Sequence, residues 1–326
     1  MQTGRTLLRL TLVAALVLPL VSCGFFDQLG AMRTFKEANL LYGRGDYEAA
    51  IEEYSHVVDV VNEDPDSELS QAMSVAYFFL ANSYDNLYTP AFRGEPENDA
   101  LLTQAVEYYR LGADRIPSAE YQTLCMQYLV AAYGPDKMND PTSRAQLLQE
   151  MILLDPENPD NYFVLAQLFE ESGLFEDAEA IYLEVRDLQS DDPTVYLQLA
   201  GFYNRAGDFE QTIDALRQRA AIEPDNPEAF YTISTFYWEK AFRDFRITQD
   251  EKAEYVLAGI EAADQAIALN DRYVDALVYK NILLRMQANM SEDQDEQDAL
   301  IAQADELRDR AQEIQDEARG GGAAGQ

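Results

Sequence analysis

The chain has 326 residues, of which 47% are hydrophobic and 25% are charged, so it is long enough and apolar enough to bury a substantial core. Its formal net charge is −35, and a field of this sign repels phosphate groups. The composition therefore argues against nucleic acid as a partner, and it disfavours attraction to anionic lipid headgroups. We expect any protein or peptide partner to be neutral or basic.

Residues 1–22 have the layout of an export signal. Arg5 and Arg9 precede an apolar run over residues 10–21, which is short for a bilayer span and contains Pro19. Because the two arginines are the only charges in this segment, its removal would take the net charge from −35 to −37.

The apolar run ends in Leu20-Val21-Ser22-Cys23, which resembles the lipobox of bacterial lipoproteins. The resemblance implies cleavage before Cys23, a diacylglycerol on its sulfur, and contact with the membrane through this lipid anchor only. Gly24 at the next position implies export to the outer membrane, facing the periplasm. The alternative is an ordinary secretory signal followed by an incidental cysteine. We expect residues 23–30 to form a linker to the folded part.

Three helix pairs are predicted before residue 158. The first covers residues 31–64 and turns at Gly45-Asp46-Tyr47, where a glycine in the left-handed conformation ends one helix and an aromatic residue packs back on the pair. The second pair is divided by residues 88–98, a Pro- and Gly-rich segment that predicts a protruding loop. The third covers about 118–157 and contains a long turn through Gly134-Pro135.

The middle of the chain overlays on itself at intervals of 34 residues. Each unit begins at a proline, and four columns then carry aromatic, large aliphatic, small and aromatic residues in that order. The starts are Pro159, Pro193 and Pro227, and the columns are Tyr162, Tyr196 and Phe230, then Leu165, Leu199 and Ile233, then Ala166, Ala200 and Ser234, then Phe169, Tyr203 and Tyr237. A period of this length is typical of a helical solenoid.

The sixth pair contains an insertion over residues 242–250. Its first helix is predicted to run on through Trp238, and residues 238–246 hold the only tryptophan and three basic residues. We interpret this segment as a helix extension whose basic side chains pair with neighbouring acids and whose rings pack under the insertion. The alternative is a binding hot spot, because Trp and Arg dominate such sites.

A divergent seventh pair is predicted over residues 273–288 and about 294–317. Its last helix is strongly charged, as expected of a terminal cap that faces water. Residues 316–326 are expected to form a Gly-rich disordered tail.

The repeated units resemble tetratricopeptide repeats, and the lipobox makes the whole chain similar to bacterial lipoproteins that contain them. The resemblance implies an all-α fold, a TPR-like α-solenoid of about seven antiparallel helix pairs over residues 31–315 that forms a right-handed superhelix. It also implies that the first helix of each pair lines a concave face that binds proteins or peptides.

The sequence contains no constellation that indicates catalysis, a metal or a cofactor. Its single histidine, His56, and the isolated Cys125 cannot build a zinc site from nitrogen and sulfur ligands. No glycine-rich phosphate loop and no Gly-x-Ser-x-Gly turn occur. Cys125 is expected to act as a small apolar core residue. We therefore expect a protein that is not an enzyme.

Residues offset from the packing columns on the first helices are predicted to line the concave groove. Rings would supply contact area there, and amides would bind the backbone of an extended ligand. The predicted groove residues are Asn39, Tyr42, Phe78, Asn82, Asp85, Phe163, Gln167, Leu197, Asn204, Arg205, Tyr231 and Trp238. For each of them the alternative is packing against the adjacent helix.

These features favour a non-enzymatic, lipid-anchored scaffold of the cell envelope that binds other proteins or peptides, with a role in envelope or outer-membrane assembly. An alternative is a periplasmic adaptor for secretion, pilus or peptidoglycan machinery. A third reading is an accessory subunit of an enzyme.

Overall fold

The computed structural model describes residues 27–322, with side chains up to residue 319. The predicted signal and Cys23 lie outside the described residues. The helices are residues 27–43, α2 (Tyr47–Glu63), α3 (Glu68–Met73), α4 (Ala76–Leu87), the short 3₁₀ helix η1 (Pro90–Phe92), α5 (Pro96–Arg115), α6 (Ala119–Ala132), α7 (Pro141–Leu154), α8 (Pro159–Glu171), α9 (Phe175–Leu188), α10 (Pro193–Ala206), α11 (Phe209–Ile222), α12 (Pro227–Arg243), α13 (Gln249–Leu269), α14 (Val274–Ala288) and α15 (Gln294–Gly322). This part of the chain contains no β-strand, which confirms the all-α prediction.

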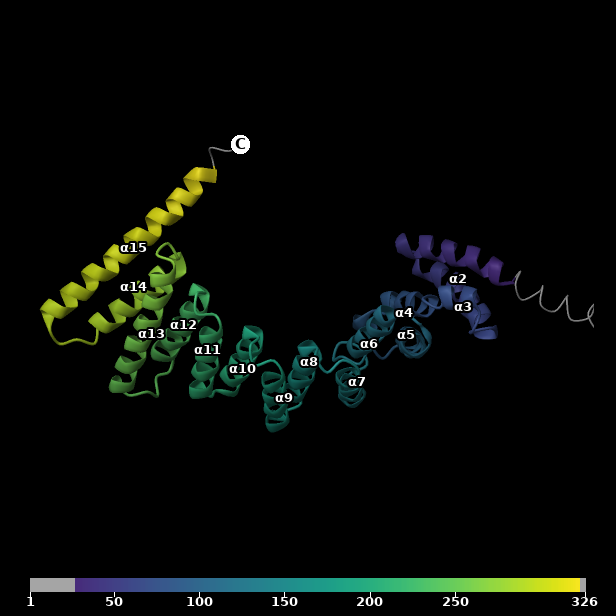
Figure 1. Ribbon diagram of the computed structural model, residues 1–326, viewed down its shortest axis with the longest axis horizontal. Coiled ribbons are helices and arrows are strands. Elements are labelled where there is room, and N and C mark those ends of the chain that lie inside the picture. Colours follow the sequence, from purple (N-terminus) through teal and green to yellow (C-terminus); the bar gives the residue numbers. More distant parts are fainter. Residues whose placement is uncertain (1–26, 323–326) are drawn as a thin grey trace, which may run out of the picture. The chain divides into compact units, whose positions relative to one another are not determined.

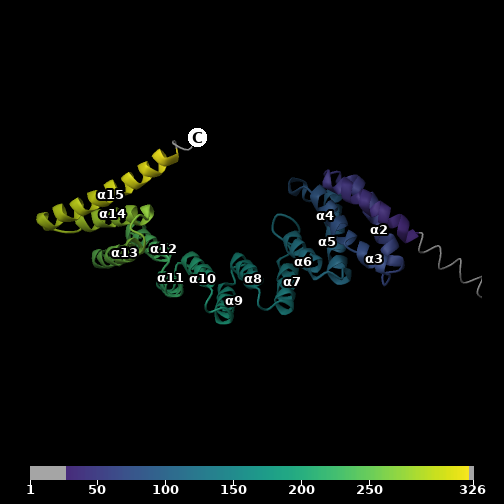
Figure 2. The ribbon, with the colours of Figure 1, turned by 45° about the horizontal axis from the view of Figure 1, so that its top comes forward.

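The chain divides into two compact units, residues 1–156 and residues 157–326. In the first unit, helix 27–43 pairs with α2, α4 with α5, and α6 with α7. In the second unit, α8 pairs with α9, α10 with α11, α12 with α13, and α14 with α15 (Figures 1 and 2). The described residues therefore form seven antiparallel helix pairs of the TPR-like type.

Glycines make the tight turns inside three of these pairs. Gly45, Gly173 and Gly207 have φ angles of 77°, 75° and 79°, a left-handed conformation that costs glycine little because it has no Cβ. The turn predicted at Gly45 is confirmed, and Gly173 and Gly207 make the same turn in the second unit.

Proline and a preceding polar residue start the first helices of the second unit. Pro159, Pro193 and Pro227 each occupy the first helical position, where the missing N–H group would have no partner inside the helix. The residue before each proline accepts a hydrogen bond from the backbone N–H two positions on, as Asp192 does from Thr194 at 2.8 Å.

The packing columns form the core of the second unit. Leu165 and Leu199 are 1% and 2% exposed, and Ala166 and Ala200 beside them are buried. Such small residues let neighbouring helices approach closely.

The same close approach occurs between α5 and α6 in the first unit. An ideal Cβ atom on Gly112 would lie 2.6 Å from the Sγ atom of Cys125, so only glycine fits there without a shift. Cys125 is fully buried, as expected, and burial raises the pKa of its thiol to about 12.

The segment predicted as a protruding loop, residues 88–98, is held against the turn between α6 and α7. Thr89 and Asn98 exchange two hydrogen bonds of 2.9 and 3.2 Å. Arg93 donates to the carbonyl oxygen of Pro135, in the turn between α6 and α7, at 3.0 Å. The two long connections of this unit are therefore tied to each other.

The insertion of the sixth pair agrees with the prediction in one respect and differs in another. Lys240 and Arg246 both pair with Asp244 at 2.9 Å, which confirms a helix extension whose basic side chains meet acids. The rings of Phe242 and Phe245, however, are 64% and 95% exposed. The expectation that they pack under the insertion is wrong, because only five residues separate α12 from α13, too few to fold over them.

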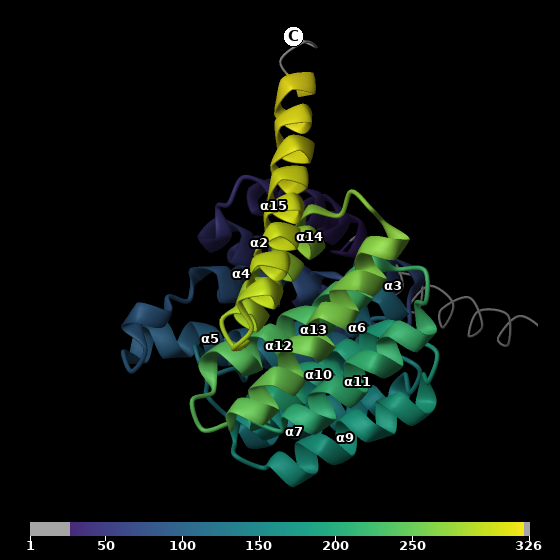
Figure 3. The ribbon, with the colours of Figure 1, turned by 90° about the vertical axis from the view of Figure 1, so that its left-hand side faces the viewer.

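Both ends of the described part are more helical than predicted. The first helix starts at residue 27, inside the expected linker, and α15 continues to Gly322. No proline follows residue 317, and Arg319 in the last turn is favourable at the negative end of the helix dipole. Figure 3 shows that α15 extends past α14, on which its first half packs. Within residues 27–322, no helix combines the length and the hydropathy that a bilayer span requires.

Candidate functional site

A row of rings, four of them half-buried and one exposed, lies between α12 and α14 in the second unit. Tyr231, Trp238 and Phe242 are spaced by seven and four residues, which places them on one face of α12. Tyr273, just before α14, and Tyr279, within it, complete the row. We refer to these five residues as the aromatic row.

Edge-to-face and stacked ring contacts join the members of the row. The ring of Tyr279 lies 5.3 Å from that of Trp238 and 5.4 Å from that of Tyr231, at interplanar angles of 86° and 82°. Phe242 stacks on Trp238 at 5.4 Å. Such contacts hold each ring in one orientation. The row is therefore a preformed surface with little side-chain freedom to lose on binding.

The row also contains polar groups, one of which is enclosed by its neighbours. The indole N–H of Trp238 is buried and has no hydrogen-bond partner within the described residues, although buried indole N–H groups usually find one. Burial raises the pKa of Tyr231 to about 12, with a smaller contribution from Tyr279. The hydroxyl of Tyr231 therefore remains neutral to a higher pH than an ordinary phenol.

A groove of about 390 Å³ lies on the other side of α12, toward α10. Asn204, Phe209, Phe236, Lys240, Arg243 and Phe245 are among its lining residues. The ammonium group of Lys240 lies 5.2 Å from the ring centroid of Phe209, within the range of a cation–π contact. We call this hollow the α12 groove. It combines exposed rings with basic groups, which is uncommon in a chain as acidic as this one.

The residues predicted for the groove in the first unit are used inside the fold. The hydroxyl of Tyr42 donates to Oδ1 of Asn82 at 2.7 Å, and the amide of Asn82 donates to the hydroxyl of Tyr109 at 3.0 Å. Asn39 is exposed but accepts a hydrogen bond of 2.6 Å from the hydroxyl of Tyr54. These side chains join neighbouring helices to one another.

Two further predicted residues of this unit are also internal. Phe78 is 7% exposed and is surrounded by the rings of Tyr109, Tyr121 and Tyr128. The side chain of Asp85 is buried and forms an ion pair with Lys137. For Phe78, Asn82 and Asp85 the structure corrects the expectation of an exposed groove position. Side chains of α5, α6 and the turn before α7 cover them.

The predicted residues on α8 and α10 differ in their exposure and in their partners. Phe163 is buried against Tyr182, which corrects its assignment to the groove. Arg205 is exposed and makes two hydrogen bonds of 2.9 Å with Glu170, so its charge is already matched. The remaining three, Gln167, Leu197 and Asn204, are exposed.

Of the five members of the aromatic row, sequence reasoning assigned Tyr231 and Trp238 to the groove. It did not assign Phe242, Tyr273 or Tyr279. The longer sixth unit breaks the 34-residue period, so the column positions do not extend to α14 by counting. A search for rings after the insertion, at helical spacing on the next first helix, would have pointed to Tyr279.

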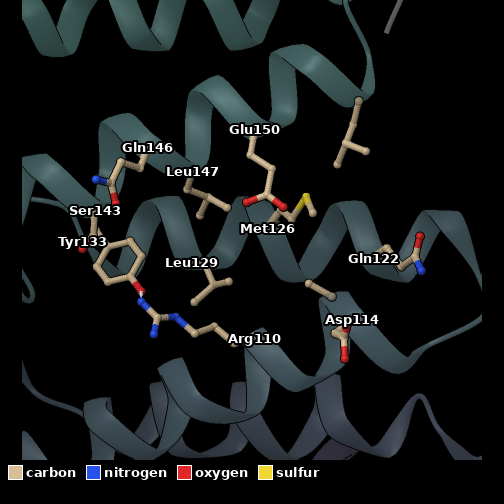
Figure 4. A pocket seen from close by; sticks show the side chains of 12 residues that line it. Arg110, Asp114, Gln122, Met126, Leu129, Tyr133, Ser143, Gln146, Leu147 and Glu150 are labelled. Atoms are coloured by element: carbon tan, nitrogen blue, oxygen red, sulfur yellow. Dashed lines mark hydrogen bonds between the residues drawn. The ribbon is translucent and has the colours of Figure 1, made fainter.

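The first unit contains a second hollow, of about 560 Å³, between α5, α6 and α7. Arg110 donates a hydrogen bond to the hydroxyl of Tyr133 and lies over its ring. Figure 4 shows Glu150 of α7 pointing toward Met126 of α6, across from this pair. The hollow includes none of the predicted groove residues.

Comparison with known families identifies the repeat. Residues 139–201 match the tetratricopeptide repeat family. The match runs from just before α7 to within α10, and it confirms the repeat that the 34-residue period predicted for this part of the chain. A comparison with curated proteins gives no match.

Solved TPR structures resemble the chain at low sequence identity. The C-terminal part of a TPR repeat-containing protein from Cytophaga hutchinsonii has a TM-score of 0.50 and 17% identity, covering 86% of this chain and 98% of that one. A tetratricopeptide repeat protein from Parabacteroides merdae has a TM-score of 0.40 and 9% identity, covering 84% and 98%. MamA from Desulfovibrio magneticus has a TM-score of 0.38 and 14% identity, covering 65% and 96%. The first of these likenesses supports the TPR-like fold.

Proposed function

We propose that the protein is a non-enzymatic scaffold of the cell envelope that binds an extended segment of a partner protein along the aromatic row. The observation that carries this proposal is the preformed set of rings on and beside α12 and α14, which contact one another and remain partly exposed. Aromatic residues on a rigid surface are the usual anchors of protein interfaces.

The chemistry of the row favours one class of ligand. Apolar side chains of the partner would pack on the exposed edges of the rings. The net charge of −35 favours a neutral or basic segment. In the adjoining α12 groove, Lys240 and Arg243 are already paired with Asp244 and Glu239, so they add little attraction for an acidic ligand.

The test uses Trp238, the only tryptophan of the chain, as both anchor and reporter. Peptides selected from a random library on the full chain would be titrated while the tryptophan emission is recorded. For those that shift the emission, Trp238→Ala is then compared with the unchanged protein by calorimetry. We expect Trp238→Ala to weaken binding about thirtyfold, which corresponds to about 2 kcal/mol.

The matched control is Leu257→Ala. Leu257 is 52% exposed on α13, the second helix of the same pair, and lies outside the row. This variant should bind as the unchanged protein does. Equal affinity of the selected peptides for Trp238→Ala and the unchanged protein would refute the proposed site.

Localisation rests on the sequence, and we propose a lipid anchor at Cys23 that holds the protein at the outer membrane, facing the periplasm. The run Leu20-Val21-Ser22-Cys23 after the apolar stretch supports this proposal. Mass spectrometry of the mature N-terminus should show a diacylglycerol-modified Cys23, and Cys23→Ser should release the protein from membranes. An unmodified cysteine, or cleavage elsewhere, would contradict the anchor.

A further inference from the structure

One face of helix 27–43 is exposed and carries leucines and basic residues. Leu29, Arg33, Lys36, Leu40 and, just after the helix, Arg44 follow one another at spacings of three or four residues, which places them in a single stripe. All five are exposed, with Leu29 at 44% and Leu40 at 62%. We call this stripe the basic–leucine face.

The positive charges of this face are unmatched in a chain that has 59 acidic residues. Among the lysines and arginines of the described part, only Arg33, Lys36, Arg44 and Lys252 make neither an ion pair nor a side-chain hydrogen bond. Elsewhere the cations are taken up by neighbours, as Arg205 is by Glu170 and Arg285 by Asp305. Three of the four free cations thus lie on one stripe, beside two exposed leucines.

The stripe is also close in the chain to the proposed lipid anchor. Only three residues separate Cys23 from residue 27, where the helix begins. An extended chain spans at most about 3.5 Å per residue, so the start of the helix lies within about 14 Å of the residue that would carry the lipid. Two of the three intervening residues are Phe25 and Phe26. An acylated Cys23 therefore keeps the first turn of this helix near the headgroups.

We propose that the basic–leucine face docks on anionic phospholipid headgroups, as a second attachment beside the lipid anchor. This inference rests on the proposed acylation of Cys23. The leucines would enter the interface, and Arg33, Lys36 and Arg44 would meet lipid phosphates, in the manner of an amphipathic interfacial helix. The stripe would hold the first helix pair against the membrane surface.

The large negative charge of the chain does not oppose this contact. Charges farther from the surface than the Debye length, about 8 to 10 Å at physiological salt, are largely screened. The acid nearest the stripe on the helix is Glu37, which is adjacent to Lys36 in the chain. Over residues 27–44, from the first residue of the helix through Arg44, the charge is +1, since Asp27 and Glu37 stand against three basic residues. The proposal thus replaces the expectation that the protein contacts the membrane through its lipid alone, because it adds a local electrostatic contact.

The test places a polarity-sensitive dye on the stripe of the mature, acylated full chain. Leu40→Cys would carry the dye, because Cys125 is fully buried and the sulfur of Cys23 is acylated. The protein is reconstituted on vesicles of phosphatidylcholine with or without phosphatidylglycerol. We expect a blue shift of the dye on vesicles with phosphatidylglycerol, a smaller one on phosphatidylcholine alone, and a decrease as salt is added. The matched control, Leu257→Cys, should report water on both.

Charge reversal separates the stripe from the anchor. Adding Arg33→Glu and Lys36→Glu to the labelled protein should abolish the blue shift while the protein still floats with the vesicles through its lipid. Each basic residue lost should reduce the affinity of the stripe for the anionic surface roughly fivefold. Because both side chains are exposed, these changes should leave the helical signal unchanged.

The outcomes distinguish this inference from the proposed function. A Cys23 without lipid overturns the anchor and the docked stripe together, and the mass of the N-terminus shows it. An acylated protein that floats while the dye at position 40 reports water on anionic vesicles overturns the stripe alone. A dye shift that appears without vesicles and grows with protein concentration assigns the stripe to a second copy of the chain, which also refutes membrane docking. Peptide affinity at the aromatic row is read separately through Trp238.

Discussion

The two units use the same kind of helix surface in opposite ways. In the first unit, polar and aromatic side chains on the inner helix surfaces form hydrogen bonds with one another, as Tyr42, Asn82 and Tyr109 do. In the second unit, Tyr231 and Trp238 hold similar positions on a first helix, yet their rings stay half exposed and the indole N–H has no partner in the described part. Similar positions are thus internal in one unit and remain partly exposed in the other.

The connections of the two units also differ in what they cover. In the first unit, the turn between α6 and α7 brings Lys137 onto Asp85, and Arg93 ties that turn to the segment before α5. In the second unit, the insertion after α12 is held by Asp244 and capped by Thr248, and it leaves Phe245 in solvent. The turn of the first unit thus covers an inner surface, whereas the insertion of the second unit leaves its own ring in solvent on the other side of α12 from the aromatic row.

The largest expected effect is the loss of a packing column. Leu199→Ala should lower the free energy of unfolding by about 2 to 5 kcal/mol, because it leaves a cavity between α10 and α11. Trp238→Ala should cost clearly less, since Trp238 is only half buried. Urea unfolding followed by circular dichroism measures both. If Trp238→Ala destabilises the fold as strongly as Leu199→Ala, the aromatic row is core and the contrast between the units fails.

The next largest effect is expected when the hydrogen bonds among Tyr42, Asn82 and Tyr109 in the first unit are removed. Asn82→Ala should cost about 2 to 3 kcal/mol, because it removes the partner of the hydroxyls of Tyr42 and Tyr109 in a buried place. Gln167→Ala, at an exposed predicted position in the second unit, is the control and should change stability by less than about 0.5 kcal/mol. Equal stabilities of the two variants would show that the first-unit network is not cohesive.

A smaller effect is expected at the turn that covers the first-unit surface. Asp140 caps α7 by accepting hydrogen bonds from the backbone N–H and the hydroxyl of Ser143 at 3.0 and 2.7 Å, and these bonds lower the pKa of its carboxyl. Asp140→Ala should cost about 1 kcal/mol at neutral pH.

The pH dependence of that difference follows from the lowered pKa. The charged cap contributes fully above the unfolded value of 3.8, and the contribution is lost as pH falls through the lower folded pKa. The stability difference between the unchanged protein and Asp140→Ala should therefore shrink in acid. A difference that stays constant from neutral pH to below that range would contradict the cap.

The smallest effect is expected at the tip of the insertion. Phe245→Ser removes a ring that is 95% exposed, so the free energy of unfolding should change by less than about 0.5 kcal/mol. Thermal unfolding measures it. A larger loss would mean that the ring is packed in solution, and that the insertion closes its surface as the connections of the first unit do.

Local pattern was sufficient for the helices and their turns. Pro193 starts α10 and Gly207 ends it in the predicted conformation, and the columns of Leu165 and Leu199 are buried as expected. These features depend on residues close in sequence, such as a fixed φ, a missing Cβ and a spacing of three or four.

Pattern was not sufficient for the inner surfaces. Phe78 and Tyr231 both lie one position past a column residue, yet Phe78 is buried by Tyr121 and Tyr128 whereas Tyr231 stays half exposed. Their exposure is set by side chains tens of residues away and by the irregular lengths of the connections. The 34-residue period contains no information on these distant side chains or on the lengths of the connections.

The buried tyrosines that bind across neighbouring helices set an upper pH limit for the fold. Burial raises the pKa of Tyr54 and Tyr109 in the first unit and of Tyr182 in the second far above the ordinary value of 10.0. Below that value these phenols are neutral whether the chain is folded or not, so they add no pH dependence. Above it, the unfolded chain loses protons that the folded chain retains, and the free energy of unfolding decreases with each further rise in pH. In strong alkali the phenolate absorbance of these residues should therefore appear together with the loss of helix, as one cooperative event.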